Sequence, residues 1–316
     1  MINAYHRDSD NYCISRINID SPVPDHTLWL DLVEMEEGEN GWLNEHCPGF
    51  YEDDELHELE VSSRFFESDS GVHIRSIFPH QSGQDLRNIN IAFNLRDDLL
   101  VTLQDEPTAL FRLMRNYLKI QHIKARTPLD IIIALFDAKV EFLADTLEEI
   151  YEKLEEASQQ ALSEGDTDVD EQLRSITLQE DINGKVRLNL LDSQRCLRYI
   201  LRTCNKSLDE GQKDQIRDIL RDIDSLTPHS AFLFDKINFL MEATMGFINL
   251  EQNNIIKIFS VAAVMFLPPT LIASIYGMNF AVMPELTSTW GYPLALIMML
   301  TSAVGTYVFF KRKGWL

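Results

Sequence analysis

Two apolar segments dominate the last sixty residues of this 316-residue chain. Residues 258–276 and 293–310 are runs of nineteen and eighteen residues without a charged side chain. Since a helix rises about 1.5 Å per residue, each run can cross a hydrocarbon core about 30 Å thick. Lys257 precedes the first run, and the basic stretch 311–316 follows the second. Because basic residues stay on the cytoplasmic side, the pattern predicts two membrane spans, cytoplasmic termini and an external loop at 277–292.

The first part of the chain alternates short β-rich runs with turn-like segments. The runs are residues 28–33, 72–78, 89–95 and 99–103, and segments rich in Ser, Gly and Asp bound several of them. Residues 53–67 are predicted to be a helix. We therefore expect residues 1–127 to form an α/β domain, whose strand order the pattern does not fix.

Beyond Thr127 the apolar spacing changes to three and four residues, which is typical of helices. It predicts one helix over 129–162 and a second over about 170–204, and these form an antiparallel hairpin that occupies 128–206. A third helix begins near Asp209 and continues to Tyr276, with Pro228 as a position for a kink. Its first part, within 207–257, is a stalk that leads directly into the first span.

Small or weakly polar residues form a stripe along that third helix. Their spacing alternates between three and four residues, which places them on one helix face. The stripe consists of Asn253, Ile256, Ser260, Ala263, Leu267, Thr270, Ser274 and Gly277. Such a face either lines a pore or packs against another membrane helix, since small residues serve both purposes.

A pore would require several copies of the chain, because two spans cannot enclose one. Asn253 and Asn279 would then form rings of amide oxygens, which suit a hydrated hard cation such as Mg²⁺. Ile256 and Leu267 would form apolar constrictions that can gate by dewetting.

Composition excludes several classes of function. A formal net charge of −22 argues against binding of nucleic acid, and any single acidic cluster is most simply a solvated face. The polar amino terminus has no signal-peptide pattern, so the first 250 residues are expected to remain in the cytoplasm. The four cysteines form no Cys-x-x-Cys pair and are expected to be reduced. The chain has no phosphate-binding loop for a nucleotide and no constellation of residues that indicates an enzyme.

The tetrapeptide Tyr-Gly-Met-Asn at 276–279, followed by Met-Pro-Glu-Leu at 283–286, a second span and a basic end, resembles the CorA magnesium transporters. The likeness covers essentially the whole chain and is closest to the enterobacterial type. It implies a funnel-shaped homopentameric channel in the bacterial cytoplasmic (inner) membrane, with an α/β cytoplasmic domain, a long helical stalk and two transmembrane helices.

The resemblance also implies roles for individual residues. Gly277, Met278 and Asn279 would form the selectivity filter at the outer mouth, and the stripe would line the pore below it. Glu285 in the external loop would attract cations. Asp218 on the stalk and Glu58 in the α/β domain would hold a regulatory Mg²⁺ between subunits, which closes the channel when internal Mg²⁺ is high.

The expected cargo is Mg²⁺, with Co²⁺ and Ni²⁺ as lesser cargo, driven by the membrane potential without a nucleotide. One alternative is Zn²⁺ transport, as in a related branch of the same superfamily, although Met278 favours Mg²⁺. Another alternative is a membrane-anchored metal sensor that conducts no ion.

Overall fold

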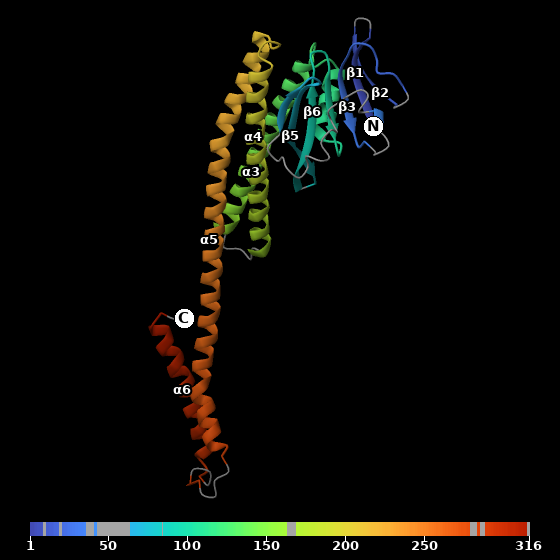
Figure 1. Cartoon of the computed structure of the whole chain (residues 1–316). Helices are drawn as coiled ribbons and strands as arrows, with labels where there is room; N and C mark the ends of the chain where they lie inside the picture. The colour runs from blue at the N-terminus through green and yellow to red at the C-terminus, as the bar shows by residue number, and fades with distance from the viewer. Residues whose placement is uncertain are drawn as a thin grey trace. The chain divides into compact units, whose positions relative to one another are not determined.

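The computed structural model describes residues 1–8, 11–18, 21–35, 41–42, 64–83, 85–162, 169–278, 283–284 and 288–314. It contains two compact units, Met1–Leu240 and Met241–Leu316. The boundary between the units falls inside the longest helix, α5 (Figure 1). The finer division of the chain into seven segments stays a prediction.

The first unit contains a seven-stranded sheet. Its strands are β1 (Ile2–Asp8), β2 (Asn11–Ile17), β3 (Thr27–Val33), β4 (Phe65–Ser68), β5 (Gly71–Ser82), β6 (Asp85–Leu95) and β7 (Leu100–Gln104). Their order across the sheet is β2-β1-β3-β7-β6-β5-β4. Strands β3 and β7 run parallel, and the other neighbours run antiparallel. The four β-rich runs of the sequence are β3, β5, β6 and β7, so those predictions are confirmed.

The prediction of a helix over 53–67 is wrong at its carboxy-terminal end, where Phe65–Ser68 is strand β4. Residues 53–63 lie outside the described residues. Strand β4 pairs with β5 across a two-residue turn, and Gly71 follows that turn with φ 126°. A Cβ at Gly71 would lie 2.6 Å from the carbonyl oxygen of Leu95, so the β4–β5 hairpin requires glycine there.

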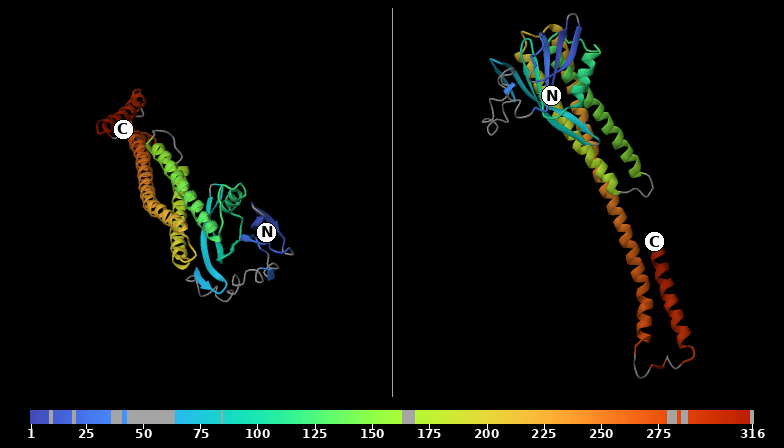
Figure 2. Two further views of the ribbon diagram at one scale, coloured as in Figure 1. Left: turned by 90° about the horizontal axis from the view of Figure 1, so that it is seen from above. Right: turned by 90° about the vertical axis from the view of Figure 1, so that its right-hand side faces the viewer.

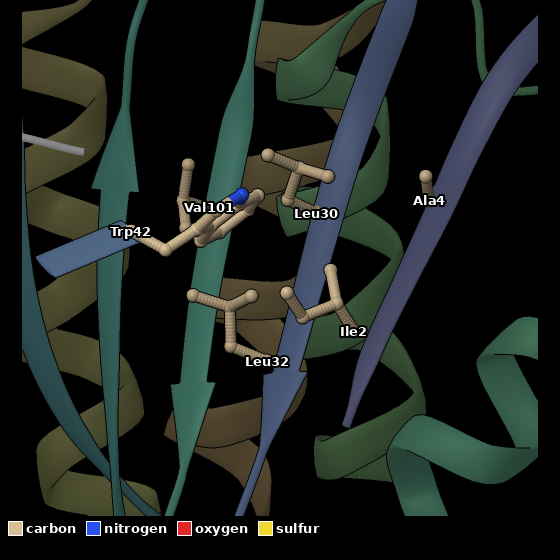
Figure 3. Close-up of a cluster of buried hydrophobic side chains, with 6 residues drawn as sticks. All are labelled: Ile2, Ala4, Leu30, Leu32, Trp42 and Val101. Carbon is tan, nitrogen blue, oxygen red and sulfur yellow. The ribbon is translucent and has the colours of Figure 1, made fainter. Parts of the chain in front are cut away.

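The two faces of the sheet bury different side chains. Alternate residues of a strand point to opposite faces, so Leu30 and Leu32 of β3 join Ile2, Ala4, Trp42 and Val101 in one apolar cluster (Figure 3). Trp29 of the same strand contacts Phe111 on the other face, with a ring separation of 6.1 Å. Helices therefore cover that second face.

The helices described in the first unit are α2 (Ala109–Lys119), α3 (Pro128–Leu162), α4 (Val169–Thr203) and the first part of α5 (Glu210–Tyr276). Three of these four helices, α2, α3 and α5, begin at capping residues. At α3, Asp130 Oδ2 accepts from the backbone N–H of Thr127 at 2.9 Å, while Thr127 Oγ1 accepts from the N–H of Asp130 at 3.2 Å. Asp209 and Gln212 make the same reciprocal pair at α5. These capping boxes explain why the helices start where the sequence predicts.

Within the first unit, helix α5 runs alongside the α3–α4 hairpin (Figure 2). Polar side chains connect the helices. Ser230 and Asn183 are both buried, with Ser230 Oγ 2.8 Å from Asn183 Oδ1. The Lys236 ammonium lies 4.0 Å from the centre of the Tyr151 ring. Since α5 remains one continuous helix at Pro228, the sequence prediction of a single helix to Tyr276 is confirmed.

Candidate functional site

The second unit brings together the end of α5 and helix α6 (Gly291–Arg312). Both are long and apolar enough to cross a membrane, and almost none of their apolar window is buried inside the chain. In Figures 1 and 2, α6 runs beside the end of α5 in the opposite direction. A pair of apolar helices with exposed apolar surfaces is what a bilayer requires.

The predicted stripe lies on an exposed side of α5. Each of its side chains is exposed in the single chain. These are Asn253, Ile256, Ser260, Ala263, Leu267, Thr270 and Ser274. The most covered residue of this stretch is Val261, at 6% exposure. Half-buried Met265, Pro268 and Ile272 follow it at helical spacing on the side away from Leu267. The stripe is therefore not the surface that packs within the chain.

Hydroxyl groups in both spans bond to their own helix. Thr270 Oγ1 donates to the carbonyl of Phe266 at 2.7 Å. In α6, Thr301 donates to Ile297 and Thr306 to Ser302, at 2.8 and 2.9 Å. Such back-bonding satisfies the hydroxyl hydrogen without a partner helix. Thr270 keeps acceptor lone pairs on the exposed stripe, where a hydrated cation could use them.

Helix α5 ends at the start of the predicted filter. The N–H of Gly277 donates to the carbonyl of Ala273 at 2.9 Å, and that of Met278 donates to Ile275 at 3.3 Å. A Cβ at Gly277 would lie 3.1 Å from the Ala273 carbonyl oxygen, which is closer than ordinary contact. Asn279 and Glu285, the other two residues predicted for the outer mouth, lie outside the described residues.

The predicted regulatory acid Asp218 is exposed on the first part of α5. Its Oδ1 lies 2.8 Å from Arg221 Nη2 one turn along the helix. Glu58, its proposed partner, lies outside the described residues. Among the residues that the structure does describe, no three His, Cys, Asp or Glu side chains gather closely enough to hold a metal ion. Asp218 therefore belongs to no such group within the described part of a single chain.

Further acids face each other near this part of α5. Burial raises the pKa of the Asp137 carboxyl on α3, and the nearby carboxylates of Glu141 and Asp222 raise it further. Asp222 lies on α5 one turn beyond Asp218. Asp137, Glu141 and Asp222 are thus neighbouring acids close to the predicted regulatory position.

Comparison with known proteins identifies the family. A family model described as "CorA-like Mg2+ transporter protein" matches residues 24–312. The chain is 44% identical over 312 residues to the Magnesium transport protein CorA of Escherichia coli strain K12, with 97% of this chain and 98% of the relative covered. The chain belongs to the CorA family of Mg²⁺ transporters. The magnesium transport protein CorA of Yersinia pseudotuberculosis is 45% identical over 311 residues, with 97% and 98% coverage.

The CorA fold is seen in the solved structures as well. The complete CorA magnesium transporter from Methanocaldococcus jannaschii matches with a TM-score of 0.75 at 18% identity, covering 100% of this chain and 99% of that one. At this identity the likeness shows the fold alone. The predicted fold class is confirmed for a single chain, namely an α/β domain, a long helix and two apolar helices that fit a membrane.

The sequence reasoning missed two buried ionic centres in the first unit. Asp31 on β3 accepts hydrogen bonds from Arg115, Thr102 and Gln104. Asp192 on α4 accepts from Ser76 Oγ at 2.5 Å and from the N–H of Ile77 at 3.0 Å, and it lies 3.6 Å from the ammonium of Lys139.

The position of Lys139 in the sequence indicates that this base is buried and paired. It lies in the apolar rhythm of α3 between Phe136 and Val140, where a base is out of place unless it is paired. Its ammonium lies 4.5 Å from the centre of the Phe78 ring, and the side chain is completely buried. No comparable signal identified Asp192 as the partner, because the pairing depends on how α4 packs on the sheet.

Proposed function

We propose that this protein carries Mg²⁺ across the bacterial inner membrane. Family membership over residues 24–312 is the observation that supports this proposal most strongly. The exposed stripe on α5 and the helix end at Gly277-Met278 supply a surface suited to the task. Co²⁺ and Ni²⁺ are proposed as lesser cargo, since both are hydrated divalent cations that present the same charge to a ring of amides.

The ion pathway forms only when several copies assemble. Two spans cannot enclose a channel, whereas a ring of chains turns each exposed stripe residue into a ring of side chains. A homopentamer is proposed from the family resemblance. Asn279 then forms the outer filter, with Glu285 attracting cations above it and Asn253 lining the inner end.

The driving force proposed for uptake is the membrane potential. A divalent ion that enters through an inside-negative potential of 100 mV gains about 4.6 kcal/mol, at about 2.3 kcal/mol per charge. No nucleotide is needed for uptake in that direction. Both termini are placed in the cytoplasm, because Lys257 and the bases that follow Phe310 mark the inner side of each span.

A regulatory site between subunits is proposed to close the channel. Asp218 would supply one carboxylate and Glu58 of a neighbouring copy the other. Repeated copies of a chain with net charge −22 repel one another. Divalent ions that bridge the copies relieve that repulsion, so a fall in internal Mg²⁺ loosens the closed ring.

The deciding experiment compares Mg²⁺ uptake by the intact protein and by Asn279→Ala in proteoliposomes with an inside-negative potential. Asn254→Ala is a matched control, since it removes an exposed amide that lies beside the stripe on α5. Uptake is expected to collapse in Asn279→Ala while the oligomer persists, and to continue in Asn254→Ala. If the intact protein takes up no Mg²⁺, the proposal fails, and Zn²⁺ flux then separates a zinc transporter from an anchored sensor.

A further inference from the structure

The basic residues of the second unit all lie at the same height along the two antiparallel helices, far from the loop that connects them. Residues 241–316 contain four bases in total, Lys257 on α5 and Lys311, Arg312 and Lys313 at the end of α6. Lys257 lies nineteen residues before Tyr276, and Lys311 lies twenty residues after Gly291. At about 1.5 Å per residue, both lie about 30 Å from the connecting loop. The antiparallel helices therefore carry their bases at the same depth.

These four bases have no acidic partner within the part of the chain that the structure describes. All four side chains are exposed, and no carboxylate in the described residues lies within 4 Å of any of them. Some bases in the first unit are paired, since Lys153, Lys185 and Arg217 each pair with an acid on their own helix. In a chain with 50 acids and 28 bases, four bases gathered at one level of two helices form a distinct surface.

The neighbouring side chains suit the boundary between lipid and water. Lys311 Nζ lies 5.9 Å from the centre of the Tyr307 ring, and both residues are exposed. Tyrosine favours the level of the headgroups, and lysine extends from a membrane helix toward the same level. Phe310 is buried at 9% exposure and fixes the end of α6, so the bases start from a defined position.

We propose that Lys257, Lys311, Arg312 and Lys313 form a binding surface for the phosphate of anionic phospholipid headgroups. Unpaired bases at this depth meet the headgroup phosphates directly, and their charge favours lipids with a net negative headgroup over zwitterionic ones. The inference rests on the placement of the two helices in a bilayer. It does not depend on which ion the protein carries.

The test is native mass spectrometry of the purified full chain in detergent with equal amounts of phosphatidylglycerol and phosphatidylcholine. The intact protein is expected to retain phosphatidylglycerol in clear excess. Lys311→Gln/Arg312→Gln/Lys313→Gln is expected to lower the relative affinity for phosphatidylglycerol by about 100-fold at low salt, since each base near an anionic surface contributes roughly fivefold.

Two further variants control for net charge and folding. Lys119→Gln/Lys124→Gln/Arg126→Gln makes the same change in net charge at exposed bases of the first unit and is expected to keep the lipid preference. Lys311→Arg/Lys313→Arg keeps the positive charges and is expected to keep it too. Equal retention of the two lipids by the intact protein, or a preference that survives the triple glutamine change, would overturn the proposal.

A third arm separates lipid from free phosphate. Inorganic phosphate without lipid is expected to give no adduct that depends on Lys311, Arg312 and Lys313. If it binds there as well as phosphatidylglycerol does, the surface recognises a soluble anion and the assignment to lipid is wrong. Mg²⁺ uptake is measured separately, so failure of lipid binding and failure of transport are distinguishable.

Discussion

At Gly277, just past the end of helix α5, an added side chain would be crowded by the preceding turn. Substitution by alanine would press a methyl group against the Ala273 carbonyl oxygen, 3.1 Å from the ideal Cβ position. The carbonyl must give by a few tenths of an ångström, and we expect this shift to reach Met278 and the proposed filter. We expect Gly277→Ala to lower the rate of Mg²⁺ uptake by roughly tenfold, equivalent to about 1.4 kcal/mol. Gly305→Ala in α6 is the control, because its added Cβ would meet nothing within 4 Å outside the backbone of its own helix.

The cysteines allow a prediction that depends on pH. Burial raises the pKa of the Cys196 thiol to about 12 and that of Cys204 to about 11. The reactive thiolate is therefore scarce at both positions until the pH approaches these values. At pH 8, N-ethylmaleimide is expected to modify the half-buried Cys13 and to leave Cys196 and Cys204 intact. Peptide mass spectrometry measures this.

Labelling of the unfolded protein is the control for that experiment. In denaturant the two buried thiols return to an ordinary pKa near 9.0 and are expected to react at pH 8. Cys13→Ser should remove the folded-state label from the peptide that contains residue 13. Rapid labelling of Cys196 in the folded protein at pH 8 would contradict the burial described above.

At the scale of elements, Asp192 joins α4 to α3 and to strand β5. Removal of its carboxylate leaves the ammonium of Lys139 buried beside Ser76 without a counter-charge. We expect Asp192→Ala to lower the free energy of unfolding of the first unit by about 3–5 kcal/mol. Denaturant titration, followed by the fluorescence of buried Trp29, measures the change.

Two comparisons separate the buried pair from an ordinary surface pair. Glu149→Ala removes the partner of Lys153 on the exposed side of α3 and is expected to change the free energy of unfolding by less than about 0.5 kcal/mol. Lys139→Met together with Asp192→Leu removes both buried charges and should be milder than Asp192→Ala alone. If Glu149→Ala lowers the free energy of unfolding as much as Asp192→Ala does, burial is not the reason for the large effect at Asp192.

The exposed stripe of α5 yields a prediction about water access. Single cysteines at Ala263, Leu267 and Ser274 are expected to react with a charged, water-soluble thiosulfonate reagent in proteoliposomes. Cysteines at Phe259 and Phe266, which are also exposed in one chain but lie off the stripe, are expected to face lipid and stay unreactive. Stripe cysteines as unreactive as those at Phe259 and Phe266 would mean that the stripe packs between helices, which is the alternative that spacing alone leaves open.

The parts of the fold that can be predicted from the sequence are those set by interactions between residues close together along the chain. Helices α3 and α5 could be placed because their capping residues and apolar rhythm are local in sequence. Strands β1 and β2 were missed because residues 2–17 are mostly polar and pair at the sheet edge. The pairing of β3 with β7 joins residues about seventy positions apart, and no local pattern encodes it.

The same distinction applies to the candidate site. The stripe and the Gly-Met-Asn motif could be found because they are local patterns of one helix and its end. Asp218 is identified only by its distance along the chain from that motif. The motif does not predict the ion pair between Asp218 and Arg221. An inter-subunit site forms only when a second copy of the chain is present. The sequence of one chain can suggest candidate ligands, but it does not show which of them come together in the oligomer.

At the scale of the whole molecule, the ion pair between Asp218 and Arg221 allows a test of the proposal that Mg²⁺ bound at Asp218 closes the channel. Asp218 is bound to Arg221 in the single chain, so a bridging Mg²⁺ must compete with a guanidinium for the carboxylate. We expect Asp218→Ala to raise the internal Mg²⁺ concentration that halves uptake by roughly tenfold, since it removes one carboxylate ligand worth about 1.4 kcal/mol. Uptake by proteoliposomes loaded with graded Mg²⁺ gives this concentration directly.

Helix α5 provides its own control one turn earlier. Asp214 pairs with Arg217 at 2.6 Å in the same three-residue spacing and is equally exposed to solvent. Asp214→Ala should leave the half-closing concentration unchanged, which separates loss of a specific ligand from loss of one negative charge. Arg221→Gln should move the concentration the other way, because Mg²⁺ no longer competes with the guanidinium. If Asp218→Ala and Asp214→Ala behave alike, the acidic surface as a whole governs closure and Asp218 is not a ligand.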